Sequence, residues 1–392
     1  MRYLDNKFRA ISVLTAALIL AGCASTPYER PAIDMPATWT HGAAKPARSD
    51  QALVAQLQAD PWWQAAHDEQ LNALQTMALQ RNADLAVAGW NVRNAWLAAG
   101  NAMGNRLPSA SGSLSGSTSR EVDGTGSWQK SYGSSLGASW QVDLWGNLAA
   151  QQSQAEWEAK ATEQDRLAAG LTLTGMVATT YWQLAVAQQK LQSQKTSLER
   201  ARKTLQLVQV QRTAGAVSGL ELAQAQQTVA NQESTLAQLQ QNQVQLQNSL
   251  AILLNVAPDQ LPSAAWHARL PDAQTLPTVP AGVPADVLAR RPDLQAAEMR
   301  LRASLANVDA TRTSFYPTLS LTGGLTGGGS SLLSILSNPV AALGASVSLP
   351  FLNAGQMKRN IATSENSYQK AIETFRQTLL KAFADVETAL SN

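Results

Sequence analysis

Side chains that could perform chemistry are few and scattered in this sequence. The chain has one cysteine, Cys23, which excludes a disulfide framework. The three histidines, His41, His67 and His267, lie far apart, which argues against a histidine-based metal site. The glycines of 323–329 are not followed by the lysine of a phosphate-binding loop, and beside a predicted strand they indicate a flexible loop. The sequence therefore predicts no catalytic residue, no metal and no cofactor.

The single cysteine lies at the end of an N-terminal leader. Ala10–Leu20 is an uncharged, mostly apolar run of 11 residues after three basic residues, which is typical of a signal peptide and too short for a membrane-spanning helix. The run ends in Leu20-Ala21-Gly22-Cys23, which is similar to the bacterial lipobox. This similarity predicts removal of residues 1–22 and attachment of an N-acyl chain and a diacylglycerol to Cys23. Ala24, where inner-membrane lipoproteins usually have Asp, implies the outer membrane. The alternative is a chance cysteine after an ordinary signal peptide.

The charge balance excludes one class of partner. The chain has 30 basic and 28 acidic residues, and 27 of each remain once residues 1–22 are removed. Without a basic excess to displace counterions, we expect no nucleic-acid partner. No other stretch approaches 18 continuous apolar residues, so no helix is expected to span a bilayer.

Prolines divide the chain into linkers and long helical tracts. Residues 23–60 are predicted to be an anchor and linker, and residues 256–289 a second, proline-rich linker. Between them, no proline occurs from residue 109 to residue 257. Because proline breaks helix interiors, this tract can hold long helices, predicted at 147–213 and 219–254.

Apolar residues recur every seven positions along the helical tracts. Sustained seven-residue spacing indicates a coiled-coil seam, so these helices need partners along their length. Residues 68–104 are also predicted to be helical. The repeating positions are Val177, Leu184, Leu191, Leu198 and Leu205, then Leu222, Val229, Leu236 and Leu250, and finally Ile361, Tyr368, Phe375, Ala382 and Ala389.

Four segments alternate between apolar and small polar residues, which predicts strands. They fall in two regions: two strands within 109–145, and two at about 317–327 and 341–352. A strand of this length can cross a bilayer when tilted, but four strands cannot close a barrel. If they span a membrane, several copies of the chain must pool them around a lumen lined by small polar residues. The alternative is a pair of edge hairpins in a soluble sandwich.

The sequence also contains a duplication with constant spacing. Adding 209 to the residue number maps Asp84 onto Asp293 and Gly146 onto Gly355, and it preserves the alternation of the strands. The chain therefore holds two copies of one helix–strand–strand–helix unit. The first repeat is predicted at 61–255 and the second at 290–392.

Along nearly its whole length the chain resembles the TolC-like outer-membrane efflux family, and within it the lipid-anchored branch that serves multidrug efflux systems of the resistance–nodulation–division (RND) type. The order and spacing of several motifs together carry this resemblance. They are Leu20-Ala21-Gly22-Cys23, Pro61-Trp62-Trp63, Asn82-Ala83-Asp84-Leu85, Asp143-Leu144-Trp145-Gly146, Arg290-Arg291-Pro292-Asp293-Leu294, Phe315-Tyr316-Pro317 and the segment from Leu349 to Gly355.

The resemblance implies a mostly helical fold with a membrane β part. Each chain of a homotrimer would give four strands to a 12-stranded barrel and long coiled-coil helices to a periplasmic tunnel. The function implied is a passive exit duct in the outer membrane for drugs or other small molecules, not an enzyme. An inner-membrane RND-type pump and a periplasmic adaptor would be its partners, and outer-membrane lipid would surround the barrel.

The resemblance also implies a docking tip for the adaptor where one long helix turns into the next. The residues there are Arg212, Gly215, Gly219, Leu220 and Glu221. Gly215 and Gly219 would allow the turn, and Arg212 and Glu221 could make polar docking contacts. The alternative is that these residues only build a helix hairpin.

The second repeat is shorter than the first. It has no counterparts for the region from Leu184 to about Asn255, so we expect a C-terminally truncated chain and name no gate residue. The alternative functions are a duct for type I protein secretion or metal efflux, and a non-assembling fragment that acts as a lipid-anchored coiled coil.

Overall fold

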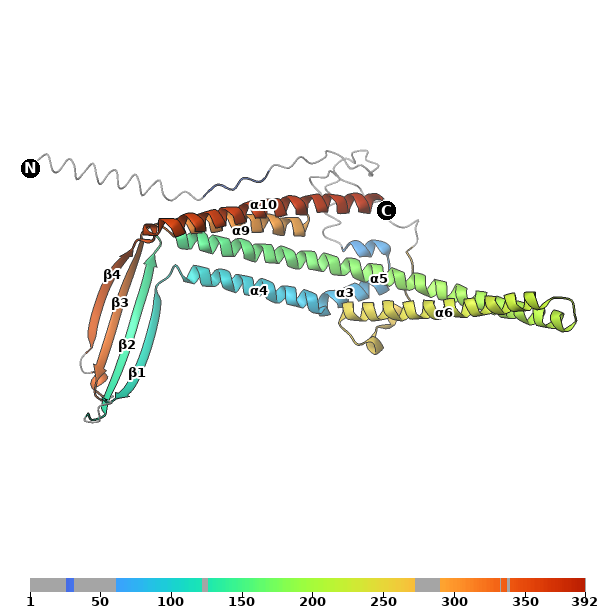
Figure 1. Cartoon of the computed structure of the whole chain (residues 1–392), viewed down its shortest axis with the longest axis horizontal. Helices are drawn as coiled ribbons and strands as arrows, with labels where there is room; N and C mark the ends of the chain where they lie inside the picture. The colour runs from blue at the N-terminus through green and yellow to red at the C-terminus, as the bar shows by residue number, and fades with distance from the viewer. Residues whose placement is uncertain are drawn as a thin grey trace, which may run out of the picture. The chain divides into compact units, whose positions relative to one another are not determined.

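The computed structural model describes residues 26–31, 61–121, 126–271, 290–331, 333–336 and 339–391 (Figure 1). The chain divides into two compact units, each made of separate stretches. Unit 1 comprises residues 1–37, 91–165 and 284–392, and unit 2 comprises residues 38–90 and 166–283. The predicted lipidation residue, Cys23, and large parts of both predicted linkers lie outside the described residues.

Unit 1 contains one antiparallel sheet of four strands in the order β1-β2-β3-β4 (Figure 1). Runs of serine, threonine and glycine that alternate with larger residues form the strands, as the two-residue period predicts. Within the described part of the chain, β1 and β4 each pair on one side only. The strands are β1 (Ser109–Ser119), β2 (Gln129–Val142), β3 (Thr318–Gly329) and β4 (Val340–Ser348).

The predicted duplication is confirmed by the pairing register. Ser109 of β1 pairs with Ser139 of β2, and the equivalent residues of the second repeat, Thr318 of β3 and Ser348 of β4, pair in the same way. Helices α4 (Ala83–Gly104) and α9 (Pro292–Thr313) have 22 residues each and begin at equivalent positions of the two repeats. The chain therefore folds one helix–strand–strand–helix unit twice.

Two details of the strands differ from the sequence-based expectation. The glycines of 323–329 were expected to form a loop, which is wrong: they belong to β3, and Gly328 pairs with Gly133 of β2. Strand β4 ends at Ser348 and not near 352, because Pro350 has no N–H for the ladder and begins the 3-10 helix η4 (Pro350–Leu352). A further 3-10 helix, η3 (Leu333–Leu336), lies between β3 and β4.

Helices α9 and α10 (Ala354–Ser391) pack side by side in unit 1 (Figure 1). Their shared core includes Leu294 and Leu301 from α9 and Phe375 from α10. Phe375 is one of the predicted heptad residues of the last helix, so the seven-residue spacing identifies a buried seam.

Unit 2 has its core around the middle of α5 (Asn147–Thr213), which has 67 residues. The core is apolar and almost fully buried, and Val177 and Leu184 of the predicted heptad line lie at its centre. The other elements that lie in unit 2 are η1 (Trp62–Ala66), α3 (Glu69–Arg81), α6 (Gly219–Leu254), η2 (Pro258–Gln260) and α7 (Ser263–Trp266).

The helix expected at 68–104 is interrupted at Asn82, which separates α3 from α4. The side-chain oxygen of Asn82 accepts a hydrogen bond from the Leu85 N–H at 2.9 Å, and its amide donates to the Leu253 carbonyl at 3.0 Å. Asn82 thus caps α4 and ties it to α6. No described helix has a stretch long and apolar enough to cross a bilayer.

Candidate functional site

The two faces of the sheet differ in chemistry. Every second residue of β1, from Ser109 to Ser119, is serine, and the register places these serines on the same face as Ser135 and Ser139 of β2. The hydroxyls of Ser113 and Ser135 lie 2.8 Å apart. One face therefore presents hydroxyl groups and glycine, which water can solvate.

The opposite face of the same sheet is mostly apolar. Leu136 of β2 pairs with Leu325 of β3 on this face, and Leu114 of β1 and Leu343 of β4 lie on it as well. Leu114 and Leu343 are 83% and 93% exposed, so within the described chain nothing shields these side chains from solvent. A sheet with one hydroxylated and one bare apolar face fits a boundary between water and lipid.

Motif residues from both repeats meet where the strands join the helices. The carboxylate of Asp143 accepts hydrogen bonds from the N–H groups of Leu148 and Ala149, at 3.1 and 2.8 Å, and so caps α5. The indole of Trp145 donates to the Pro317 carbonyl at 2.8 Å, and its ring contacts Tyr316 edge-on at 5.3 Å between centroids. These contacts fix the sheet to the helices of unit 1.

The predicted tip residues come together in the turn between α5 and α6. Gly215 has a φ of +73°, a conformation that other residues adopt only at a cost. Its N–H donates to the Arg212 carbonyl at 3.1 Å, and the N–H of Ala216 donates to the Gln211 carbonyl at 2.9 Å. This is a Schellman motif, which satisfies the last carbonyls of α5 and stops the helix.

Helix α6 begins at Gly219 with a capping box. Ser218 accepts a hydrogen bond from the Leu220 N–H at 3.1 Å, while the carboxylate of Glu221 accepts from the Ser218 N–H at 2.9 Å and from its hydroxyl. The hydrogen bond from this hydroxyl lowers the pKa of Glu221. Arg212 donates to the Val217 carbonyl at 3.2 Å. The polar groups of Arg212 and Glu221 therefore serve the turn itself.

Apolar side chains remain bare beside this turn. Leu220 is 66% exposed and Val210 is 63% exposed. Further along the hairpin, Arg202 of α5 pairs with Glu233 of α6 at 2.7 Å, so the two helices are held together below the tip. The tip is a hydrogen-bonded turn that presents aliphatic side chains.

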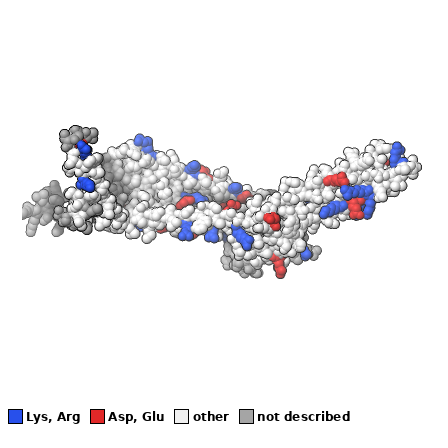
Figure 2. All heavy atoms as spheres, turned by 90° about the horizontal axis from the view of Figure 1, so that it is seen from below, with Lys and Arg blue, Asp and Glu red and all other residues white. Residues whose placement is uncertain are grey.

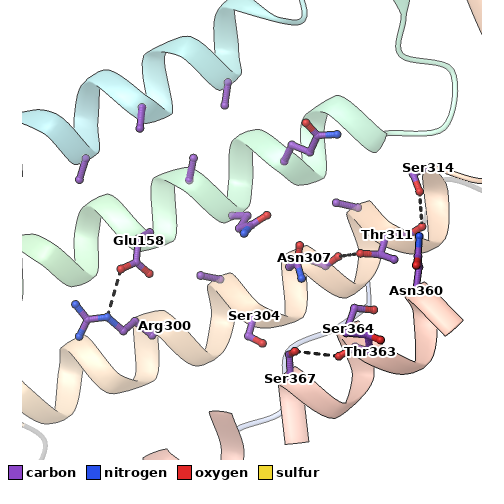
Figure 3. A pocket seen from close by; sticks show the side chains of 18 residues that line it. Glu158, Arg300, Ser304, Asn307, Thr311, Ser314, Asn360, Thr363, Ser364 and Ser367 are labelled. Carbon is purple, nitrogen blue, oxygen red and sulfur yellow. Dashed lines mark hydrogen bonds and ion pairs between the residues drawn. The ribbon is translucent and has the colours of Figure 1, made fainter. Parts of the chain in front are cut away.

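An open groove of about 1070 Å³ lies among α4, α5, α9 and α10 within unit 1 (Figure 3). Its wall consists mainly of alanines and uncharged polar side chains, with the ion pair between Glu158 and Arg300. The uncharged residues labelled in Figure 3 are Ser304, Asn307 and Thr311 from α9, Ser314 directly after α9, and Asn360, Thr363, Ser364 and Ser367 from α10.

Arg300 of α9 is the basic residue of this groove, and it joins α9 to α5. Its guanidinium lies 3.3 Å from the Glu158 carboxylate and also pairs with Asp165 (Figure 3 draws the first pair). The hydrogen bond with Asp165 is the main cause that raises the pKa of Arg300. The pairs are partly exposed, so we assign them a role in alignment more than in stability.

Figure 2 shows basic and acidic side chains interspersed on the face in view, with large areas that carry neither. This distribution agrees with the near-neutral sequence. Within the described part of the chain, no three His, Cys, Asp or Glu side chains cluster closely enough to hold a metal ion.

Two features of the structure were not predicted from the sequence. The capping role of Ser218 could have been found, because Ser218-x-x-Glu221 is the sequence signature of a capping box. The hydrogen bonds that Thr26 donates to Asp309 of α9 gave no such signal, because residues 26–31 have no apolar periodicity.

Comparisons with known proteins agree with this geometry. The family model described as outer membrane efflux protein matches residues 74–256 and 283–392. The chain is 33% identical to the pyoverdine export outer membrane protein OpmQ of Pseudomonas putida, over 98% of this chain and 82% of that protein. It is 29% identical to the cation efflux system protein CusC of Escherichia coli, over 96% of this chain and 81% of that protein.

A solved structure shows the same fold. The open-state MtrE outer membrane channel of Neisseria gonorrhoeae superposes with a TM-score of 0.76 and 27% identity, over 94% of this chain and 81% of that one. The predicted resemblance to TolC-like channels is confirmed. The chain belongs to the outer membrane efflux protein family and is an outer-membrane component of an efflux system.

Proposed function

We propose that this chain is the passive exit duct of a tripartite efflux system and works as a homotrimer. The observation that carries the proposal is the sheet, which has one hydroxylated face, one mostly apolar face and, within the described residues, two unpaired edges, β1 and β4. Open strand edges are not tolerated in lipid. Because the chain contributes an even number of antiparallel strands, β4 of one copy and β1 of the next run antiparallel and can pair.

The width of barrels and the family resemblance both support three copies. Two copies would give eight strands, and the interior of an eight-stranded barrel is just wide enough for side chains to fill it. Three copies give a 12-stranded barrel, in which the serine-rich face would line a water-filled lumen and the leucines would face lipid. The groove with Arg300 and its short polar side chains suits a tunnel wall that lets small molecules pass without chemistry.

The turn between α5 and α6 is the proposed docking surface for the periplasmic adaptor. The polar groups of Arg212 and Glu221 are satisfied within the turn, so the exposed side chains of Leu220 and Val210 would supply apolar contact. An inner-membrane pump of the RND type would provide the energy.

Lipid on Cys23 would be the second attachment to the outer membrane. One lipidated residue anchors weakly by itself, and the barrel would supply the stable insertion. In this arrangement the duct has no catalytic role, and the choice of exported molecule rests with the pump.

The experiment that tests the proposal uses two neighbouring residues on opposite faces of β1. Leu114→Lys places a charge on the proposed lipid face, where it costs about 2–4 kcal/mol at mid-membrane, whereas Ser113→Lys places the same charge in the lumen. We expect Leu114→Lys to lower barrel assembly in outer membranes. We expect Ser113→Lys to assemble, to form discrete channels in planar bilayers and to shift their selectivity towards anions. Equal assembly of both variants, or no channels from the assembled protein, would refute the duct.

A further inference from the structure

A short N-terminal segment of unit 1, residues 26–31, lies along α9, and we call it the strap. Thr26 makes two hydrogen bonds to the Asp309 carboxylate, from its N–H at 3.0 Å and from its hydroxyl at 2.5 Å. Four residues later, Arg30 pairs with Glu298 at 3.1 Å. The strap therefore runs antiparallel to α9 and contacts it over three turns of helix.

The centre of the strap is a stack of three planar groups. The guanidinium of Arg302 lies 4.3 Å from the ring centroid of Tyr28 in the strap and 4.9 Å from that of Trp157 in α5. Both distances are within the range of a cation–π contact. Arg302 comes from α9, so the stack joins the strap, α9 and α5.

The carboxylate of Glu298 interacts with three side chains at this contact. It accepts from Arg302 at 3.0 Å and from the Tyr28 hydroxyl at 3.4 Å, and it also pairs with Arg30. Burial of the Tyr28 hydroxyl raises the pKa of this group, with a smaller contribution from Glu298. The tyrosine thus stays neutral and stacked over the pH range of the cell. Arg30 also lies 5.8 Å from the centroid of Phe375, on α10.

We infer that the strap is a latch that closes the seam between α5 and α9 by holding Arg302 between Tyr28 and Trp157. Helix α5 belongs to the first repeat and α9 to the second, so the latch fastens the two repeats of one chain within unit 1. The inference rests only on contacts within the chain and does not depend on lipidation or on the trimer.

Protease cleavage after Tyr28 tests the latch, because chymotrypsin cleaves after aromatic residues that it can reach. In the intact protein the contacts with Arg302 and Glu298 cover part of Tyr28 and hold it against α9. In Arg302→Ala, which loses both ring contacts, we expect cleavage between Tyr28 and Glu29 to be about tenfold faster. In Arg302→Lys, which keeps the charge beside Glu298 but loses the planar group, we expect an intermediate rate.

Arg312→Ala is the matched control. Arg312 lies on the same helix and pairs with Glu365 of α10 at 2.6 Å, but no described contact joins it to the strap. We expect the wild-type cleavage rate at Tyr28 in this variant. If Arg302→Ala is cut no faster than wild type, or Arg312→Ala is cut equally fast, the latch is refuted.

A second measurement separates the latch from general unfolding. Tyr28→Ala removes the ring, whereas Tyr28→Phe keeps the ring and removes the hydroxyl. We expect hydrogen exchange in α9 to become several-fold faster in Tyr28→Ala and to stay near wild type in Tyr28→Phe, with α6 unchanged in both. If hydrogen exchange in Tyr28→Ala rises equally in α6, or does not change in α9, the inference is overturned. The result of the conductance experiment on the β1 variants does not depend on this outcome.

Discussion

Replacement of Gly215 tests whether the turn between α5 and α6 is the working tip of the duct. Gly215 has a φ of +73°, and a Cβ placed on it would meet no atom within 4 Å. In Gly215→Ala the cost is therefore conformational and not steric, about 1–2 kcal/mol for an L-residue in the left-handed region. Local opening of the turn should become roughly 5–30 times more frequent.

Proline at the same position is more severe. Its ring fixes φ in the negative range, so the turn cannot keep its shape, and the hydrogen bond from the Gly215 N–H to the Arg212 carbonyl is lost. We expect Gly215→Pro to cost about 3 kcal/mol or more locally. The strands lie in unit 1, so barrel assembly should not change.

The matched control is Gly219→Ala. Gly219 is the first residue of α6, its φ is not in the left-handed region, and a Cβ there also meets nothing within 4 Å. Alanine should be neutral or stabilise the helix by up to about 1 kcal/mol. Both glycines thus receive the same side chain, and only Gly215 should respond.

The assay has two readouts. Hydrogen exchange of the peptide that spans 211–222 measures opening of the turn, and drug resistance of a strain that depends on this protein measures function. We expect resistance to fall from wild type to Gly215→Ala to Gly215→Pro at equal amounts of assembled protein. Full drug resistance in Gly215→Pro would refute a docking role for this turn. Loss of barrel assembly in Gly215→Pro would show that the barrel depends on the shape of this turn.

Three further perturbations have defined outcomes. The hydrogen bond with Arg291 holds the pKa of Asp293 below its usual 3.8 in the folded protein. The stability that this pair contributes is therefore fully present above pH 3.8 and is lost as the pH falls through the pKa of folded Asp293. Asp293→Asn should remove this step from a plot of melting temperature against pH. Tyr181→Phe removes a buried hydroxyl that donates to Asp68 at 2.7 Å. We expect the free energy of unfolding of unit 2 to fall by about 1.5–3 kcal/mol. An unchanged midpoint of urea unfolding would show that this hydrogen bond does not stabilise unit 2. Cys23→Ser should abolish acylation, seen as a mass loss, but leave trimer formation intact, and loss of trimers would show that the barrel is not the main anchor.

The repeated unit could be predicted from the sequence because its signals are local. Helices α5 and α6 lie within the proline-free tract, where apolar residues recur every seven positions. The constant offset between the repeats predicts that β1–β2 and β3–β4 pair in the same register. The apolar periodicity predicted the ends of helices and strands less well where a single residue decides the end. Pro350 ends β4 early, and Asn82 interrupts the first helix.

The features that were not predicted depend on tertiary partners. The glycines of 323–329 favour a loop by propensity, but pairing with β2 makes them a strand. Residues 26–31 were predicted to be part of a linker. Their packing could not be seen in the sequence, because the contact between Tyr28 and Arg302 joins residues 274 positions apart and leaves no periodic pattern. The tip residues lie in the turn where they were expected, and their role in docking stays a prediction.

Native mass spectrometry of the protein extracted from outer membranes in detergent tests the central claim most directly. It counts the subunits in one particle and weighs each of them. We expect a particle of three identical subunits, because three chains of four strands each form a 12-stranded barrel in which β1 and β4 are paired. A monomer or a dimer as the intact membrane species would contradict the 12-stranded duct.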